Sequence, residues 1–201
     1  MSSTRTLFRP VGLKEAELIL KADSRAFPPR LPGQPIFYPI LNQEYASQIA
    51  REWNAPKEPH FAGFVTRFEI DADYSGQFEE RVVGSSRHRE FWVPAEQLEE
   101  FNRHIVGRIE LVEAHYGNGY QGPIPISATL KGKRVDEQLR TLTDGATAIS
   151  EEKALIQLNF AWWVRAPAES QGLDVRRKGL TLKQIVETLK GTSPDFNLLM
   201  A

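Results

Sequence analysis

The side chains best placed to do chemistry together are His88 and Glu90, two residues apart at the start of an apolar stretch over residues 89–93. Strand interiors disfavour glutamate, and a buried carboxylate is costly unless it is paired. The two-residue repeat of a strand would put His88 and Glu90 on one face. There they could share a proton, orient a hydroxyl or stabilise a positive charge. The alternative is an edge strand whose polar face is simply solvated.

Four other residues are candidates for binding a ligand. Arg9 lies in an apolar segment, residues 7–12, where its guanidinium could hold phosphate or carboxylate oxygens. A structural ion pair is the alternative for this arginine. Tyr38 lies next to a proline and could wall a pocket for a flat ring, or could belong to the core. Asn42 is more typical of a helix N-cap, and Thr66 is common in an ordinary strand.

Composition excludes several kinds of site. The 201 residues include no cysteine, so a disulfide, a thiolate nucleophile and a cysteine-ligated zinc site are excluded. The four histidines lack the spacing of a helical metal pair, and we expect no metal site. A glycine-rich phosphate loop is also absent, which argues against a P-loop or Rossmann nucleotide site.

Charge and hydropathy bear on partners and location. The net charge of −1 gives no argument for a nucleic-acid or membrane partner. The basic residues 176–178 leave nucleic-acid binding open as a minor reading. No apolar run approaches the roughly 18 residues that span a bilayer, and the absence of cysteine fits a cytosolic protein. We therefore expect a cytoplasmic protein with no membrane partner.

The scaffold that must position these side chains is predicted to be α+β, with helices early and strands late. Hydrophobic periodicity and turn residues mark its elements. Strands are expected over residues 7–12, 36–41, 61–70, 78–83, 89–93 and 108–112, and helices over 14–22, from Asn42 to a break at 54–59, and over 96–102.

A turn-rich segment, residues 117–125, predicts a linker between a first domain (1–116) and a mostly helical extension (126–201). One helix is expected there over residues 136–142. Ser150 predicts the N-cap of a second helix that contains Trp162 and Trp163, a pair more typical of a core than of a ring-stacking site. Thr181 predicts the N-cap of a third, stopped by Gly191 and Pro194.

The order of these segments resembles the ADP-ribosyltransferase fold, whose core is a split β-sheet. The resemblance lies in the strand-borne Arg9, the aromatic segment 37–46, the strand with Thr66 and the late strand with Glu90. More narrowly, residues 9–12, 38–42 and 92–96 resemble short bacterial proteins labelled ADP-ribosylation/crystallin J1-like. The resemblance covers about residues 7–113.

The resemblance implies that NAD is the substrate and that four of these positions bind it. Arg9 would hold the dinucleotide, Tyr38 would pack the nicotinamide, and Thr66 would support the site. Asn42, at the end of the aromatic segment, is counted with them. No metal is implied.

The resemblance also implies the reaction. Glu90 would be the catalytic carboxylate of an NAD-dependent glycosyl transfer or NAD hydrolysis, stabilising an oxocarbenium-like transition state. His88, the second catalytic candidate, stands where enzymes that modify arginine usually carry Glu or Gln, so the acceptor could be a protein or a nucleic acid. The alternative function is a non-catalytic module that binds a protein partner, with residues 126–201 as the contact region.

Overall fold

The computed structural model describes residues 3–120, 130, 133, 135–144, 153–165 and 174–192. The chain divides into two compact units, residues 1–120 and 121–201, and the division falls inside the turn-rich segment 117–125. The first unit mixes strands and helices, and the described part of the second is helical. The chain is therefore of the α+β class.

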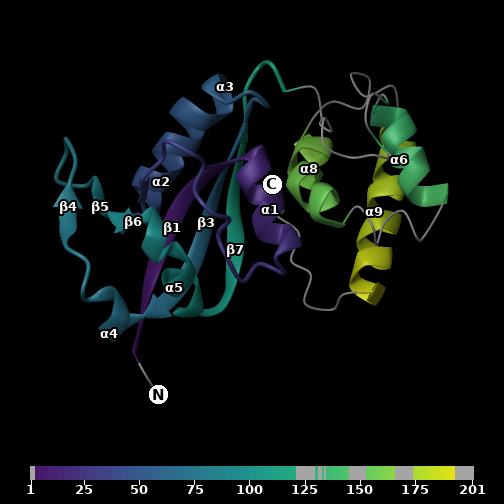
Figure 1. Ribbon diagram of the computed structural model, residues 1–201. Coiled ribbons are helices and arrows are strands. Elements are labelled where there is room, and N and C mark those ends of the chain that lie inside the picture. Colours follow the sequence, from purple (N-terminus) through teal and green to yellow (C-terminus); the bar gives the residue numbers. More distant parts are fainter. Residues whose placement is uncertain are drawn as a thin grey trace. The chain divides into compact units, whose positions relative to one another are not determined.

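The first unit is built on a three-stranded antiparallel sheet in the order β1-β3-β7 (Figure 1). These strands are Thr4–Gly12, Ala62–Asp71 and Ile105–Tyr116. Residues 62–66 of β3 are buried on both faces, whereas further along Phe68 and Ile70 are buried on one face and Arg67, on the other, is exposed. The first half of the central strand is therefore covered on both faces, and the second half alternates between a buried apolar face and a polar face.

Two short strand pairs extend the sheet beyond β1. Ile40 forms isolated bridges to Phe8 of β1 and to Glu90, so it joins the two parts. Its N–H donates to Phe8 O (2.7 Å), and Phe8 N–H donates to Ile40 O (2.8 Å). The pairs are β2 (Ile36–Phe37) with β6 (Val93–Pro94), and β4 (Glu80–Val82) with β5 (Arg89–Phe91).

The expected strand over residues 36–41 is wrong in extent, because β2 ends at Phe37. The chain changes partners at this point: Phe37 pairs with Val93 of β6, whereas Ile40 pairs with β1 and β5. Pro39 has no N–H to donate to a ladder, so it suits the place where one pairing stops and another begins.

One face of the sheet is covered by the helix that Asn42 caps. Helix α2 (Gln43–Ile49) continues as a π-helical segment (Ala50–Asn54) and then as α3 (Ala55–Lys57). The expected break at residues 54–59 is therefore placed too early. Pro56 of α3 directly follows the π-helical segment, where the regular α-helical hydrogen bonding is already interrupted, so its missing N–H is tolerated there. A Cβ at Gly63 of β3 would collide with the carbonyl of Ala50, so this glycine permits the close packing.

Glu113 of β7 ties α2 to this face. Its carboxylate accepts hydrogen bonds from Ser47 (2.5 Å) and Gln43 (2.6 Å) of α2 and lies 3.0 Å from His115 Nε2. Burial alone would raise the pKa of Glu113. The hydrogen bonds from Ser47 and Gln43, and then the contact with His115, more than offset that effect, so its pKa is lowered.

The other face carries an aromatic cluster. The Phe27 ring lies 4.9 Å from that of Phe37 and 5.0 Å from that of Phe68, and Phe37 lies 5.3 Å from Phe101. Asn102 fastens Phe27 in place, because its amide accepts from the Phe27 N–H and donates to the Phe27 carbonyl, both at 2.9 Å. The remaining helices of this unit are α1 (Leu13–Lys21), α4 (Ala72–Ser75), a 3-10 turn (Ala95–Gln97) and α5 (Leu98–Arg103).

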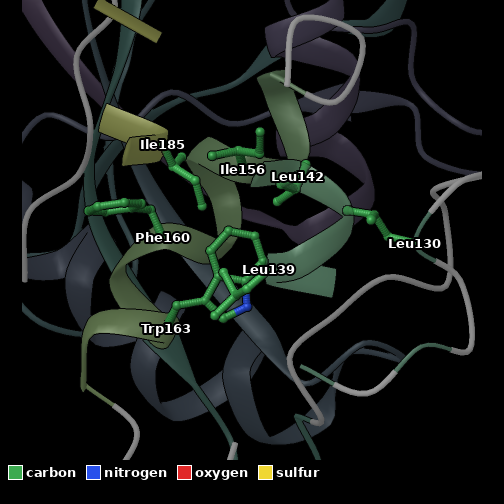
Figure 2. Close-up of a cluster of buried hydrophobic side chains, with 7 residues drawn as sticks. All are labelled: Leu130, Leu139, Leu142, Ile156, Phe160, Trp163 and Ile185. Carbon is green, nitrogen blue, oxygen red and sulfur yellow. The ribbon is translucent and has the colours of Figure 1, made fainter. Parts of the chain in front are cut away.

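The second unit contains α6 (Val135–Asp144), α8 (Lys153–Arg165) and α9 (Val175–Thr192). Their buried side chains form one apolar cluster, which includes Trp163 and thereby confirms its expected core role (Figure 2). The other members of the cluster are Leu130, Leu139, Leu142, Ile156, Phe160 and Ile185. Trp162 is partly buried against it.

The helix ends in this unit differ from those expected. Thr181 is not an N-cap but lies inside α9, which begins six residues earlier and also includes Gly191. Threonine inside a helix costs only a few tenths of a kcal/mol, so tertiary packing easily overrides the capping signal. Ser150 and Pro194 lie outside the described residues. Within the described ranges, no helix has both the length and the apolar character to cross a membrane.

Candidate active site

Glu90 is a buried carboxylate in the interior of the extended sheet. It lies on β5 between Ile40 on one side and Arg81 of β4 on the other, and only 7% of it is exposed. The alternative of a solvated edge strand is therefore wrong. The indole N–H of Trp92 donates to Glu90 Oε1 (2.7 Å), which partly satisfies the buried charge.

Glu90 lines a cavity of about 340 Å³ together with Arg9, Tyr38 and Trp92. Three of the residues chosen from the sequence thus converge on one cavity, although they are 29 and 52 positions apart along the chain. Pro10, Ile40 and Ile49 complete the lining. The Tyr38 ring meets Trp92 edge to face, with centroids 5.9 Å apart, and the Arg81 guanidinium lies 4.3 Å from the Trp92 ring centre. The cavity therefore has one carboxylate and an aromatic wall.

The guanidinium of Arg9 faces away from Glu90. Directly paired residues share a face of a sheet, so Phe8, Ile40 and Glu90 lie on one face. Arg9 follows Phe8 and therefore points to the opposite face, where its guanidinium lies 4.6 Å from the centre of the Phe37 ring. Arg9 and the neighbouring Pro10 nevertheless belong to the lining of the cavity beside Glu90.

Arg9 is held in an ion pair, as the alternative reading of this residue anticipated. Its Nε donates to Glu15 Oε1 (2.8 Å) and its Nη2 to Glu15 Oε2 (3.2 Å), a two-pronged contact. Its Nη1 donates to the carbonyl of Tyr38 (3.3 Å). Whether it also binds a ligand stays a prediction.

Thr66 and Asn42 support the site from outside the cavity. The buried Thr66 hydroxyl donates to the Arg9 carbonyl (3.0 Å) and so fixes the backbone of β1 at this point. Asn42 caps α2 by accepting from Tyr45 N–H (2.8 Å), which confirms the expected cap. Its amide also donates to Arg87 O and so connects α2 with the segment that precedes β5.

His88 lies outside the cavity, two residues before Glu90. Its ring stacks on Tyr45, with centroids 4.1 Å apart and planes 8° from parallel, and its Nδ1 lies 3.1 Å from Val83 O. Tyr45 is in turn close to Glu90: burial raises the pKa of Tyr45, and the Glu90 charge raises it further. His88 is thus next to Tyr45 and separated from the cavity of Glu90.

The sequence reasoning missed two residues that bond directly to the candidates. Trp92 lies two positions after Glu90, so the strand repeat that paired His88 with Glu90 applies equally to Trp92. Glu15 lies six positions after Arg9, and β1 passes directly into α1 at Gly12, which brings the first turn of α1 back to the strand. Trp92 could have been identified by its place on the same strand face as Glu90, and Glu15 by its place in the first turn of the helix that follows Arg9.

A second cavity, of about 570 Å³, adjoins the first and shares Arg9, Pro10 and Tyr38 with it. Its lining is more charged than that of the first. It contains the basic side chains of Lys14 and Arg30, His60, and the carboxylates of Glu15 and Glu58. Because the two cavities share these three residues, a ligand with one polar and one aromatic end could occupy both.

Comparison of the chain with protein-family models, with curated proteins and with solved structures found no match. Among the residues that the structure describes, no three histidine or acidic side chains are grouped so that they could hold a metal ion.

Proposed function

We propose that the protein cleaves the bond between nicotinamide and ribose in NAD, either transferring ADP-ribose to an acceptor or hydrolysing NAD. The observation that carries the proposal is the buried Glu90 carboxylate in an aromatic-walled cavity that Arg9 and Tyr38 also line. The division of the strands into a three-stranded sheet and two short pairs is compatible with an ADP-ribosyltransferase-like split sheet, which is part of the proposal.

The chemistry matches the residue types. Cleavage of the glycosidic bond leaves positive charge on the ribose, and a fixed carboxylate stabilises that charge. The Trp92 indole holds one oxygen of Glu90, so the second oxygen can accept from a ribose hydroxyl. Preorganised groups of this kind contribute roughly 10² to 10³ in rate, because they need not reorient as charge develops.

The aromatic wall suits the nicotinamide ring. Tyr38 and Trp92 present flat apolar surface at the cavity that contains Glu90, and Ile40 and Ile49 add aliphatic surface to its lining. Ligand cavities of this type bind a ring by apolar contact and orient it with a few polar groups. The charged second cavity, reached past Tyr38, would hold the remainder of the dinucleotide.

The test is nicotinamide release from NAD, followed by chromatography. The wild-type protein should release nicotinamide, and Glu90→Gln should lower the rate by about 10²-fold or more. Glu69→Gln is the matched control, since Glu69 is a partly buried strand glutamate that bonds to Thr6 and is not part of the cavity lining. The proposal is refuted if the wild-type protein releases no nicotinamide and also shows no measurable binding of NAD.

One observation favours a second function, a non-catalytic module that binds a protein partner. The guanidinium of Arg9 is already occupied by Glu15, as expected of a structural residue. This alternative predicts partner binding that is indifferent to Glu90→Gln and sensitive to changes in residues 126–201. A pull-down with wild-type and variant full-length chains separates it from the enzyme.

A further inference from the structure

The charged cavity holds two guanidinium groups and one carboxylate in close contact. The exposed fractions of the Arg9, Arg30 and Glu15 side chains are 7%, 13% and 22%. Glu15 takes both donors of the Arg9 fork, and its Oε1 lies 3.9 Å from Arg30 Nη1. One carboxylate therefore serves two largely buried cations, which leaves positive charge uncompensated within the cluster.

Arg30 is the less satisfied of the two arginines. Its Nε is buried, and among the described residues none accepts a hydrogen bond from it. Burial lowers the pKa of Arg30, and the neighbouring Arg9 charge lowers it further. A buried guanidinium with an unpaired donor is destabilising, and an anion that contacts its Nη atoms would offset part of the cost of burying its charge.

The position of Arg30 is set by the fold rather than by a free surface loop. It follows Phe27, which is buried in the aromatic cluster and is fastened by both hydrogen bonds of the Asn102 amide. Pro28 and Pro29 stiffen the intervening chain. A largely buried arginine on a rigid segment is preorganised for a bidentate ligand.

We propose that this cavity binds the phosphate-bearing part of a nucleotide through Arg9 and Arg30, and that Glu15 occupies the Arg9 fork as an internal competitor until a phosphate replaces it. The identification of the ligand as a nucleotide rests on the function proposed above, since the two cavities share Arg9 and Tyr38. A diphosphate presents the paired oxygens that guanidinium forks recognise.

The exchange of Glu15 for phosphate leaves Arg9 paired, because one anion replaces another at its guanidinium. Glu15 also keeps a favourable position after leaving Arg9, since it lies in the first turn of α1, where the helix dipole favours negative charge. The competitor therefore weakens phosphate binding without preventing it. Removing the charge of Glu15 should therefore tighten phosphate binding, and removing the guanidinium of Arg30 should weaken it.

Inorganic pyrophosphate, titrated calorimetrically into the full chain, tests the proposal. We expect Arg30→Gln to weaken pyrophosphate binding at least tenfold and Glu15→Gln to tighten it about tenfold. Glu58→Gln is the matched control: it removes a carboxylate of the same cavity that is not bonded to Arg9, so it should tighten binding clearly less than Glu15→Gln does. Circular dichroism establishes that each variant is folded.

Three results would overturn the proposal: no pyrophosphate binding by either the wild type or Glu15→Gln, equal effects of Glu15→Gln and Glu58→Gln, or unchanged affinity in Arg30→Gln. If Arg30→Gln does not fold, Arg30→Lys decides, because it keeps the charge but loses the fork, and it should still weaken binding.

The experiment also separates this inference from the proposed enzyme. Glu90→Gln should leave pyrophosphate binding unchanged. A protein that binds pyrophosphate as described but releases no nicotinamide would refute the enzyme and keep the anion site. A protein that releases nicotinamide but binds pyrophosphate independently of Arg30 would refute the anion site and keep the enzyme.

Discussion

Replacing Trp92 with phenylalanine removes the hydrogen bond to Glu90 while keeping an aromatic ring at the cavity wall. The lost bond is short, 2.7 Å, and its acceptor is a carboxylate that is only 7% exposed. Hydrogen bonds to charged groups contribute about 1.5–3 kcal/mol to stability. Because Trp92 itself is 40% exposed and water can partly replace its N–H, we expect a loss of about 1–2 kcal/mol in the free energy of unfolding.

A double-mutant cycle isolates this interaction from other effects of the smaller ring. Urea denaturation of the full chain, followed by circular dichroism, is measured for wild type, Trp92→Phe, Glu90→Gln and the double variant. The Trp92–Glu90 coupling energy should be about 1 kcal/mol or more, since the phenylalanine costs less once the carboxylate has become an amide. Additive single effects, within about 0.3 kcal/mol, would refute the role given to Trp92.

Other substitutions test the surrounding scaffold. Gly63→Ala should cost about 2 kcal/mol or more, because its Cβ would collide with a helix carbonyl, whereas Gly76→Ala, with 3.3 Å to the nearest atom, should lower the melting temperature much less. The lowered pKa of Glu113 gives stability that is present above its unfolded pKa near 4.3 and lost as pH falls through the lower native pKa. The stability difference between wild type and Glu113→Gln should therefore shrink between about pH 5 and pH 3, and a constant difference would contradict this. Asn102→Ala removes both bonds to the Phe27 backbone and should cost about 2 kcal/mol. Hydrogen exchange of residues 27–35 should then accelerate, and unchanged exchange would contradict the clamp.

Local sequence patterns predicted the elements that carry the site. The apolar repeat of residues 61–70 identified β3, and the cap at Asn42 identified the start of α2. These patterns depend on residues close in sequence. The end of β2 at Phe37 could not be read in this way, because it depends on which strand each side of Pro39 meets.

The candidate site was likewise predictable only as far as local sequence patterns reach. Glu90, Tyr38 and Arg9 were identifiable as residues with unusual placements, and they line one cavity. The bond between Arg9 and Glu15 and the stacking of His88 on Tyr45 are tertiary contacts that a strand repeat does not encode. A side chain's face can be predicted from alternation, but its partner depends on the element that packs against that face.

Tyr38 belongs to both cavities: its ring forms the wall beside Glu90, and its carbonyl accepts from Arg9. A ligand that shifts Tyr38 in one cavity therefore changes the groups that face the other. Thermodynamic linkage makes such an effect reciprocal: if the proposed anion at Arg9 changes the affinity for a ring beside Glu90, the ring changes the affinity for the anion by the same factor. Under the proposed function, Tyr38 would make the two cavities a cooperative pair: a molecule that fills both would bind more tightly than its two parts predict when the Tyr38 position favoured by one part also suits the other.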